Sequence, residues 1–278
     1  MRAQISLTVS ESKKIIAKGI ARLPAVRKAF RSRRIFLKGG TTVSAVCEEL
    51  TGKPMLIAGR ISPQGTKMAQ DYSAKFHCAL IEKGNLLAVD DILEQTLAKL
   101  HPDDVIIIGA NIIDAFGNAA MMYGVALGGK PGRIISGLMS ETKNIIVAAG
   151  LEKLVPGSLT EIIASTGRVN VELSMGMAVG LTPIVGKIIT EKEAIPLLGD
   201  VTCMVIGKGG ISGAEGATTL IIEGTEKEVK KVFQLAMSIK GTGVSGITES
   251  LPDCVAPHEK CKVHRACIYK KKKTQGDA

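Results

Sequence analysis

The chain has 278 residues, of which 45% are hydrophobic and 22% are charged, and this composition excludes extensive disorder. Aromatic residues make up 3% and tryptophan is absent, which argues against platforms that stack nucleobases. The formal charge of +10 at pH 7 suggests an acidic partner, but much of the positive charge lies in residues 13–34 and 260–273, near the two ends. We therefore favour a small phosphorylated anion over a nucleic acid as the partner.

The longest apolar runs, such as residues 105–113 and 145–150, have the length of strands and are too short to span a membrane. The first residues lack the basic region, apolar core and cleavage pattern of a secretory signal. We therefore expect a cytoplasmic protein without a membrane partner, and we expect it to form a homo-oligomer.

Short apolar runs alternate with helical patterns over residues 1–182, which predicts an α/β domain with a wound, mainly parallel, Rossmann-like sheet. Pro24 separates the first two helices, and Lys83-Gly84-Asn85 is typical of a hairpin turn. Asp90 or Asp91 is expected to cap the next helix, and the polar residues 62–73 to form a lid or an irregular connection. The expected strands are residues 35–38, 55–60, 76–81, 86–89, 105–108 and 145–148, and the expected helices are residues 10–23, 25–33, 43–50, 119–127 and a segment that ends at residue 100.

Residues 183–246 have the pattern of a smaller, ferredoxin-like α+β domain. A helix at residues 190–198, with Thr190 as its cap and Glu193 at the capping-box position, precedes strands at 201–206 and 218–223. An amphipathic helix follows at residues 225–240, and a strand near 184–188 completes the predicted domain.

The glycine-rich residues 207–216 join two of these strands and either cradle a phosphate or form a flexible hairpin loop. They lack a Walker lysine–hydroxyl pair and a strand-to-helix dinucleotide context, so no nucleotide cofactor is predicted. Residues 247–278 are a basic tail rich in cysteine and histidine.

The most informative motif is Lys38-Gly39-Gly40-Thr41-Thr42, which lies between an apolar run and a helical pattern. The two glycines allow a tight turn, while the threonine hydroxyls and the first amides of the helix can donate hydrogen bonds to a phosphate or carboxylate. Lys38 would add a positive charge beside these donors. The structural alternative is that a threonine only caps the helix behind a glycine turn.

A second motif, residues 109–114, follows the buried strand at 105–108. Asn111 and Asp114 would emerge at the carboxyl end of this strand, where ligands bind in wound α/β sheets. Asp114 is a candidate general base or a ligand for sugar hydroxyls, and Asn111 a candidate for orienting the ligand. Alternatively, Asp114 caps the next turn and Asn111 closes the strand.

These two motifs, carried by roughly residues 30–160, resemble those of the ribose-5-phosphate isomerase and CoA-transferase-like superfamily. In its isomerases and sugar-phosphate-sensing repressors, a Gly-Thr-Thr or Gly-Ser-Thr loop holds phosphate and a strand ends in Gly-Ala-Asp. The resemblance therefore implies a phosphorylated sugar or a CoA ester as ligand, and isomerisation or group transfer as the reaction. Its ribose-5-phosphate isomerases also carry a ferredoxin-like subdomain.

The chain departs from this superfamily at the reacting groups. Asn111 stands where many of the isomerases have aspartate, so a carboxylate near the reacting carbons is lost, and no Glu-Asn-Gly segment supplies the nucleophile of familiar CoA transferases. Glu152, after the strand at residues 145–148, is the candidate catalytic carboxylate at the same sheet edge. Alternatively, Glu152 forms an ordinary salt bridge or faces solvent.

The tail contains three cysteines and two histidines within fourteen residues, a density of soft ligands that points to a metal site. The preferred ligands of a tetrahedral zinc ion are Cys254, Cys261, His264 and Cys267, with His258 as a substitute. An iron–sulfur cluster is a weaker alternative, and a disordered tail with incidental thiols is a third. The other cysteines, Cys47, Cys78 and Cys203, lie in apolar runs and are expected to pack in the core.

Two functions remain open. In the first, the protein is an enzyme that binds a phosphorylated sugar or CoA ester at residues 38–42, with Asn111, Asp114 or Glu152 near the reacting group. In the second, it is a non-catalytic metabolite sensor or assembly protein whose metal-binding tail contacts a partner.

Overall fold

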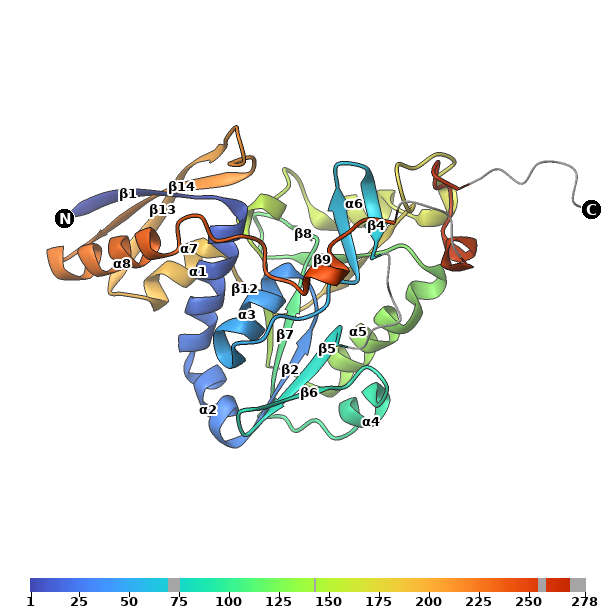
Figure 1. Cartoon of the computed structure of the whole chain (residues 1–278), viewed down its shortest axis with the longest axis horizontal. Coiled ribbons are helices and arrows are strands. Elements are labelled where there is room, and N and C mark those ends of the chain that lie inside the picture. Colours follow the sequence, from blue (N-terminus) through green and yellow to red (C-terminus); the bar gives the residue numbers. More distant parts are fainter. Residues whose placement is uncertain (70–75, 143, 255–258, 271–278) are drawn as a thin grey trace, which may run out of the picture.

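A computed structural model describes residues 1–69, 76–142, 144–254 and 259–270. Its main sheet has the strand order β12-β10-β7-β2-β5-β6 (Figure 1). The first four strands of this order are parallel, and β5 and β6 form an antiparallel hairpin at one edge. The strands are β2 (Arg34–Lys38), β5 (Cys78–Glu82), β6 (Asn85–Ala88), β7 (Val105–Gly109), β10 (Ile145–Ala148) and β12 (Lys187–Ile189). The chain is therefore mixed α/β, with a mixed six-stranded sheet.

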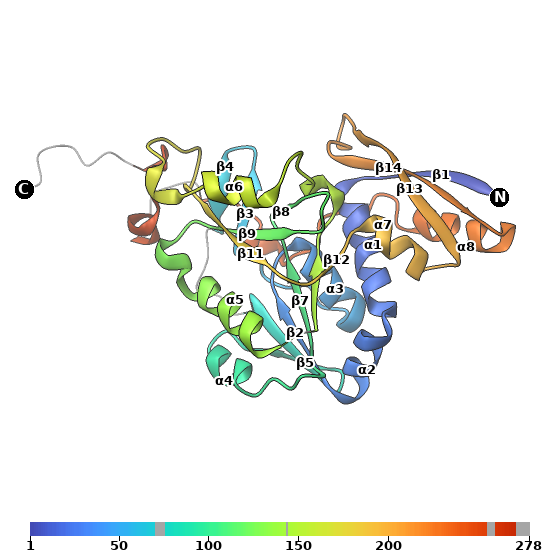
Figure 2. The same ribbon diagram turned by 180° about the vertical axis from the view of Figure 1, so that it is seen from behind.

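Helices cover both faces of the main sheet (Figures 1 and 2). Alternate residues of a strand point to opposite faces, so Ile35 and Leu37 pack into one core and Phe36 into the other. The first core includes residues of α1 (Val9–Arg22), α2 (Pro24–Ser32) and α3 (Thr41–Thr51), and the second those of α4 (Leu93–Leu97) and α5 (Gly129–Glu141). No helix among the described residues combines the length and the apolar character that crossing a bilayer requires.

A second, antiparallel sheet has the order β1-β14-β13 and lies beside the main sheet (Figure 1). It comprises β1 (Arg2–Leu7), β13 (Val201–Gly209) and β14 (Ala217–Gly224), and α8 (Glu226–Ser238) packs on it. The sequence patterns did not predict β1, whose Arg2 pairs with Glu223. Leu7 and Leu220 belong to the same hydrophobic core as Ile35, so the apolar interior continues from one sheet into the other.

The expectation of a strand near residues 184–188 in the small domain is wrong. The residues form two strands outside the small sheet: β11 (Gly180–Ile184) pairs with β9 (Ala119–Tyr123), and β12 pairs in parallel with β10. Pairing with β10 places Ile189 in the buried core that also contains Ile35.

The prediction of a helix at residues 119–127 is also wrong, since these residues begin with strand β9 (Ala119–Tyr123). Alanine and methionine favour helices, but β9 pairs on both sides, with β8 (Ile112–Ile113) and β11, and this tertiary pairing overrides the weak local preference. The helix follows later as α5, which the pattern did not reveal because it contains Pro131 and several glycines.

Asp90 does not cap α4, whose N-cap is Ile92 without a side-chain hydrogen bond. The Asp90 carboxylate instead accepts hydrogen bonds from the amides of Phe76, His77 and Cys78 and fixes the start of β5. The predicted capping box of Thr190 and Glu193 is confirmed at α7 (Glu191–Ala194).

The sequence predicts a strand at residues 55–60. It also predicts that residues 62–73 form a lid or an irregular connection. Residues 59–68 form the hairpin of β3 (Gly59–Ser62) and β4 (Gly65–Met68), and residues 70–75 lie outside the described part of the chain. A further helix, α6 (Leu159–Ser165), follows β10 in the chain.

Candidate functional site

The two sequence motifs and Glu152 all follow the carboxyl ends of strands in the main sheet. Strands β10, β7 and β2 are adjacent and parallel, with Lys38 paired to Ile108 and Gly109 paired to Ala148. The residues after each strand therefore lie at the common carboxyl end of the sheet, where wound α/β proteins bind ligands. This arrangement meets the condition for both motifs to serve one ligand.

The Gly-Gly-Thr-Thr loop (residues 39–42) joins β2 to α3. A Cβ on Gly39 would lie 2.5 Å from the carbonyl oxygen of His77, whereas a Cβ on Gly40 would meet nothing within 4 Å. Gly39 is thus required by the close approach of the protein's own backbone, and its amide donates to the His77 oxygen over 2.8 Å. The open space beside the loop is at Gly40.

The amino end of α3 has no side-chain cap. Gly40 is the N-cap residue, so neither threonine plays the capping role of the structural alternative. Thr42 is 1% exposed, and its hydroxyl has no hydrogen-bond partner among the described residues. The first amides of a helix lack intrahelical acceptors, so the loop presents backbone donors at the positive end of the helix dipole.

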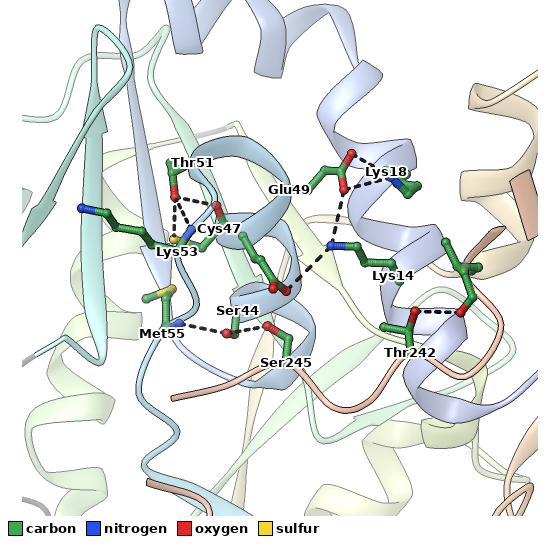
Figure 3. Close-up of polar contacts among 12 residues, drawn as sticks. Lys14, Lys18, Ser44, Cys47, Glu49, Thr51, Lys53, Met55, Thr242 and Ser245 are labelled. Atoms are coloured by element: carbon green, nitrogen blue, oxygen red, sulfur yellow. Dashed lines mark hydrogen bonds and ion pairs between the residues drawn. The ribbon is translucent and has the colours of Figure 1, made fainter. Parts of the chain in front are cut away.

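Contacts on two sides hold α3 in place (Figure 3). Lys14 and Lys18 of α1 form ion pairs with Glu49, at 3.6 and 3.2 Å. Near its amino end, the buried hydroxyl of Ser44 bonds to the Ser245 hydroxyl over 2.8 Å and accepts a hydrogen bond from the Met55 amide. The donors of the loop are therefore carried on a fixed helix.

Lys38 has the strand position of Phe36, so its side chain turns to the face of the sheet opposite α3. Its ammonium is buried and lies 3.1 Å from the sulfur of Met121. Burial lowers the pKa of Lys38, and the nearby Cys78 opposes this change. Lys38 thus lies at the carboxyl end of β2, as predicted, but its side chain lies on the opposite face of the main sheet from Thr41 and Thr42.

Asn111 and Asp114 are held by their own loop. The side-chain oxygen of Asn111 accepts a hydrogen bond from the Met122 amide. The Asp114 carboxylate accepts hydrogen bonds from the amides of Phe116, Asn118 and Leu159 and from the side chain of Asn118. These are the contacts of the structural alternative, in which Asp114 caps the turn and Asn111 closes the strand.

The hydrogen bonds also determine the pKa of Asp114. Burial alone would raise this pKa, but the bonds from Asn118, Leu159 and Phe116 outweigh burial and lower it to about 2. A carboxylate with so low a pKa accepts a proton poorly near neutral pH.

Glu152 belongs to a cluster of charged side chains between the two sheets. It lies on a short 3₁₀ helix (Leu151–Lys153) that directly follows the end of β10. Lys13 of α1 lies 3.8 Å from one carboxyl oxygen, and both oxygens are buried without a hydrogen-bond partner among the described residues. Glu152 therefore keeps its acceptor capacity for a ligand, unlike Asp114.

The neighbours of Glu152 have shifted pKa values. Burial lowers the pKa of Lys153 to about 8 and also lowers that of Lys13, although the charge of Glu152 opposes both shifts. Burial raises the pKa of Glu191, which is 0% exposed, despite its hydrogen bonds to the Leu151 amide and the Thr218 hydroxyl. Buried groups with shifted pKa values are typical of functional sites.

The glycine-rich residues 207–216 form the end of β13 and its connection to β14, as the hairpin alternative has it. Lys208 donates a hydrogen bond to the carbonyl oxygen of Leu151, and a Cβ on Gly216 would lie 3.7 Å from that of Glu152. This hairpin therefore borders the charged cluster. Sequence reasoning missed Lys13, Lys153 and Glu191 because they come from three distant segments without a shared motif.

No protein-family model matches the chain, and neither the curated proteins nor the solved structures contain a match to it.

The four preferred metal ligands of the tail line one small cavity: Cys254, Cys261, His264 and Cys267. Among the residues that the structure describes, no three His, Cys, Asp or Glu side chains stand at metal-binding spacing. His258 lies outside the described residues. Cys47 and Cys78 are buried, as expected of packing residues, and Cys203 is half-buried.

Proposed function

We propose that this protein binds a phosphorylated sugar or a CoA ester at the amino end of α3. The observation that carries the proposal is the Thr42 hydroxyl, a buried donor without a described partner on a helix whose N-terminus has no side-chain cap. Leaving a buried hydroxyl unpaired costs about 1–3 kcal/mol, and a phosphate oxygen would remove this cost. The uncapped amides and the helix dipole would add to the binding of an anion.

We infer that Glu152 is the reactive carboxylate of this site. It leaves the sheet at the same edge as the loop, and its oxygens are buried without a described hydrogen-bond partner. Group transfer by Glu152 as nucleophile, or isomerisation with Glu152 as base, both use a carboxylate with free acceptor positions. Asp114 is the weaker candidate because its acceptors are already used.

The Rossmann-like classification of the main sheet belongs to the same proposal. Four adjacent parallel strands with helices on both faces support it. The ferredoxin-like description of the small unit stays a prediction. The cytoplasmic localisation and the homo-oligomeric state of the protein also stay predictions.

A thermal-shift series with ribose 5-phosphate, CoA, acetyl-CoA and inorganic phosphate tests the ligand. A ligand of the native state raises the melting temperature with its concentration. We expect Thr42→Val to abolish this shift, while Thr202→Val, which removes an exposed hydroxyl from β13, retains it. An undiminished shift in Thr42→Val would contradict the proposed site.

The charged cluster makes catalysis testable in the same series. With the ligand that produces a shift, we expect turnover that Glu152→Gln abolishes without loss of binding. Binding without turnover in the wild-type protein would instead support the second function, a metabolite sensor whose cavity in the tail serves assembly.

A further inference from the structure

The tail folds back onto a distant part of the chain and encloses a cavity there. The walls come from β4, from residues 176 and 177, and from the tail itself (Figure 1, where β4 and the red tail lie close together). Thr66 and Lys67 contribute from β4, and the cavity measures about 20 Å³.

Backbone hydrogen bonds fix these walls. Ser174 donates to Ala266 over 2.9 Å, and Ile268 donates back to Ser174 over 3.0 Å. Thr66 donates in turn to Met175 over 3.0 Å, so the tail, residues 174–178 and β4 form one hydrogen-bonded unit. The cavity is therefore built by backbone contacts between segments about a hundred or more residues apart, and not by loose tail residues.

Lys67 is the most unusual residue of the cavity. It is 1% exposed, and none of the ion pairs among the described residues joins it to a carboxylate. Its ammonium lies 3.7 Å from the centre of the Tyr269 ring and 3.5 Å from the carbonyl oxygen of Cys254. Negative charge beside a buried cation stabilises it, and metal-bound thiolates of the lining cysteines would place such charge there.

We propose that Cys254, Cys261, His264 and Cys267 bind a single zinc ion in this cavity, with Lys67 balancing its charge. Three thiolates, a neutral imidazole and Zn²⁺ carry a net charge of about −1, which one buried lysine neutralises. Lys270 also lines the cavity and would add positive charge beside the metal centre. This site is independent of the anion site proposed at α3.

The donors that line the cavity favour a single zinc ion over an iron–sulfur cluster. Such a cluster is commonly held by four thiolates, whereas three cysteines and one histidine form a structural zinc site. Because no three described donors stand at metal-binding spacing, the side chains must rotate inward around the ion, while the hydrogen-bonded backbone holds their positions.

Metal analysis of the purified full-length protein tests the proposal. We expect about one zinc per chain, and Co²⁺ in its place should give the strong near-ultraviolet absorption of cobalt–thiolate bonds and the visible bands of a tetrahedral ion. Cys261→Ser should lose most of the metal, and Cys203→Ser, which changes a half-buried cysteine outside the cavity, should keep it. No stoichiometric zinc, equal metal content in both variants, or an iron–sulfur absorption near 400 nm would each overturn the proposal.

Two measurements do not depend on the folding of a cysteine variant. Removal of zinc from the wild-type protein by a chelator should speed proteolysis within residues 247–278, and added zinc should reverse this effect. Lys67→Met should weaken zinc binding about tenfold in competition with a chromophoric chelator, whereas Lys67→Arg should largely retain it. Unchanged proteolysis overturns the site, and unchanged affinity in Lys67→Met overturns the role of Lys67. The response to ribose 5-phosphate should be the same with and without zinc, so failure of either proposal is recognised separately.

Discussion

Lys13 Nζ on α1 lies 3.8 Å from Glu152 Oε1 at the end of β10. This contact brings an N-terminal helix to the carboxyl edge of the main sheet, where Lys153 and the buried Glu191 complete a cluster of mixed charge. The cluster combines a carboxylate that is paired with Lys13 and accepts no hydrogen bond within 3.5 Å from the described residues with amines whose pKa values are lowered by burial.

The pKa of Lys153 predicts a pH-dependent stability. The folded protein holds the pKa of Lys153 at about 8, below the ordinary lysine value of 10.5, so between these two pH values the unfolded chain binds more protons. Stability should therefore rise with pH from 8 to 10.5, by about 3 kcal/mol at most. Urea unfolding at pH 7.5, 9 and 10 should show this rise in the wild-type protein but a smaller one in Lys153→Met. Lys187→Met removes an exposed lysine and should behave as the wild type; an identical profile in Lys153→Met would refute the prediction.

Asp114→Asn should destabilise the protein by about 2 kcal/mol at pH 7. The carboxylate accepts four hydrogen bonds, and the NH2 group of the asparagine cannot accept those made to the oxygen it replaces. The pKa of Asp114 is lowered to about 2, so its contribution is present above pH 4 and is lost as the pH falls toward 2. Urea unfolding at pH 7 and pH 3 measures both effects. A difference between variant and wild type that stays the same at the two pH values would contradict this assignment.

Thr42→Val should leave stability unchanged or raise it by about 1 kcal/mol, since it replaces an unpaired buried hydroxyl by a methyl group of the same shape. Thermal unfolding without ligand measures the change. A loss of 2 kcal/mol or more would mean that the hydroxyl has a structural partner, and the anion site would lose its main support.

Gly39→Ala should destabilise by about 2 kcal/mol or more, because the new Cβ would lie 2.5 Å from the backbone oxygen of His77 and would force strand β2 from β5. Gly167→Ala is the matched control, since a Cβ there meets nothing within 4 Å. Equal melting temperatures of the two variants would show that the loop relaxes without cost.

Local patterns predicted the parts of the fold that depend on local sequence. β7 and β10 are apolar on both faces because they are buried in the middle of the sheet, and Thr190 with Glu193 forms a capping box within four residues. Strands β1 and β9 were missed because their partners decide their conformation, and those partners lie far along the chain or were assigned to other elements.

The candidate site was predictable to a similar extent. The alternation of strands and helices predicts that several segments lie at the carboxyl end of one parallel sheet: residues 39–42, Asn111 and Glu152. The different states of Asp114 and Glu152 do not follow from any motif. They depend on Leu159, Lys13 and Glu191, which only the tertiary structure brings to these carboxylates.

The pairing of β1 with β14 sets the order in which the protein can be completed during synthesis. Arg2 leaves the ribosome 221 residues before its partner Glu223. Until then the apolar side chains of Ile5 and Leu7 have no sheet to join. The nascent chain must therefore carry an unpaired strand until β14 has been made, a period in which chaperones or a second nascent chain can compete for it.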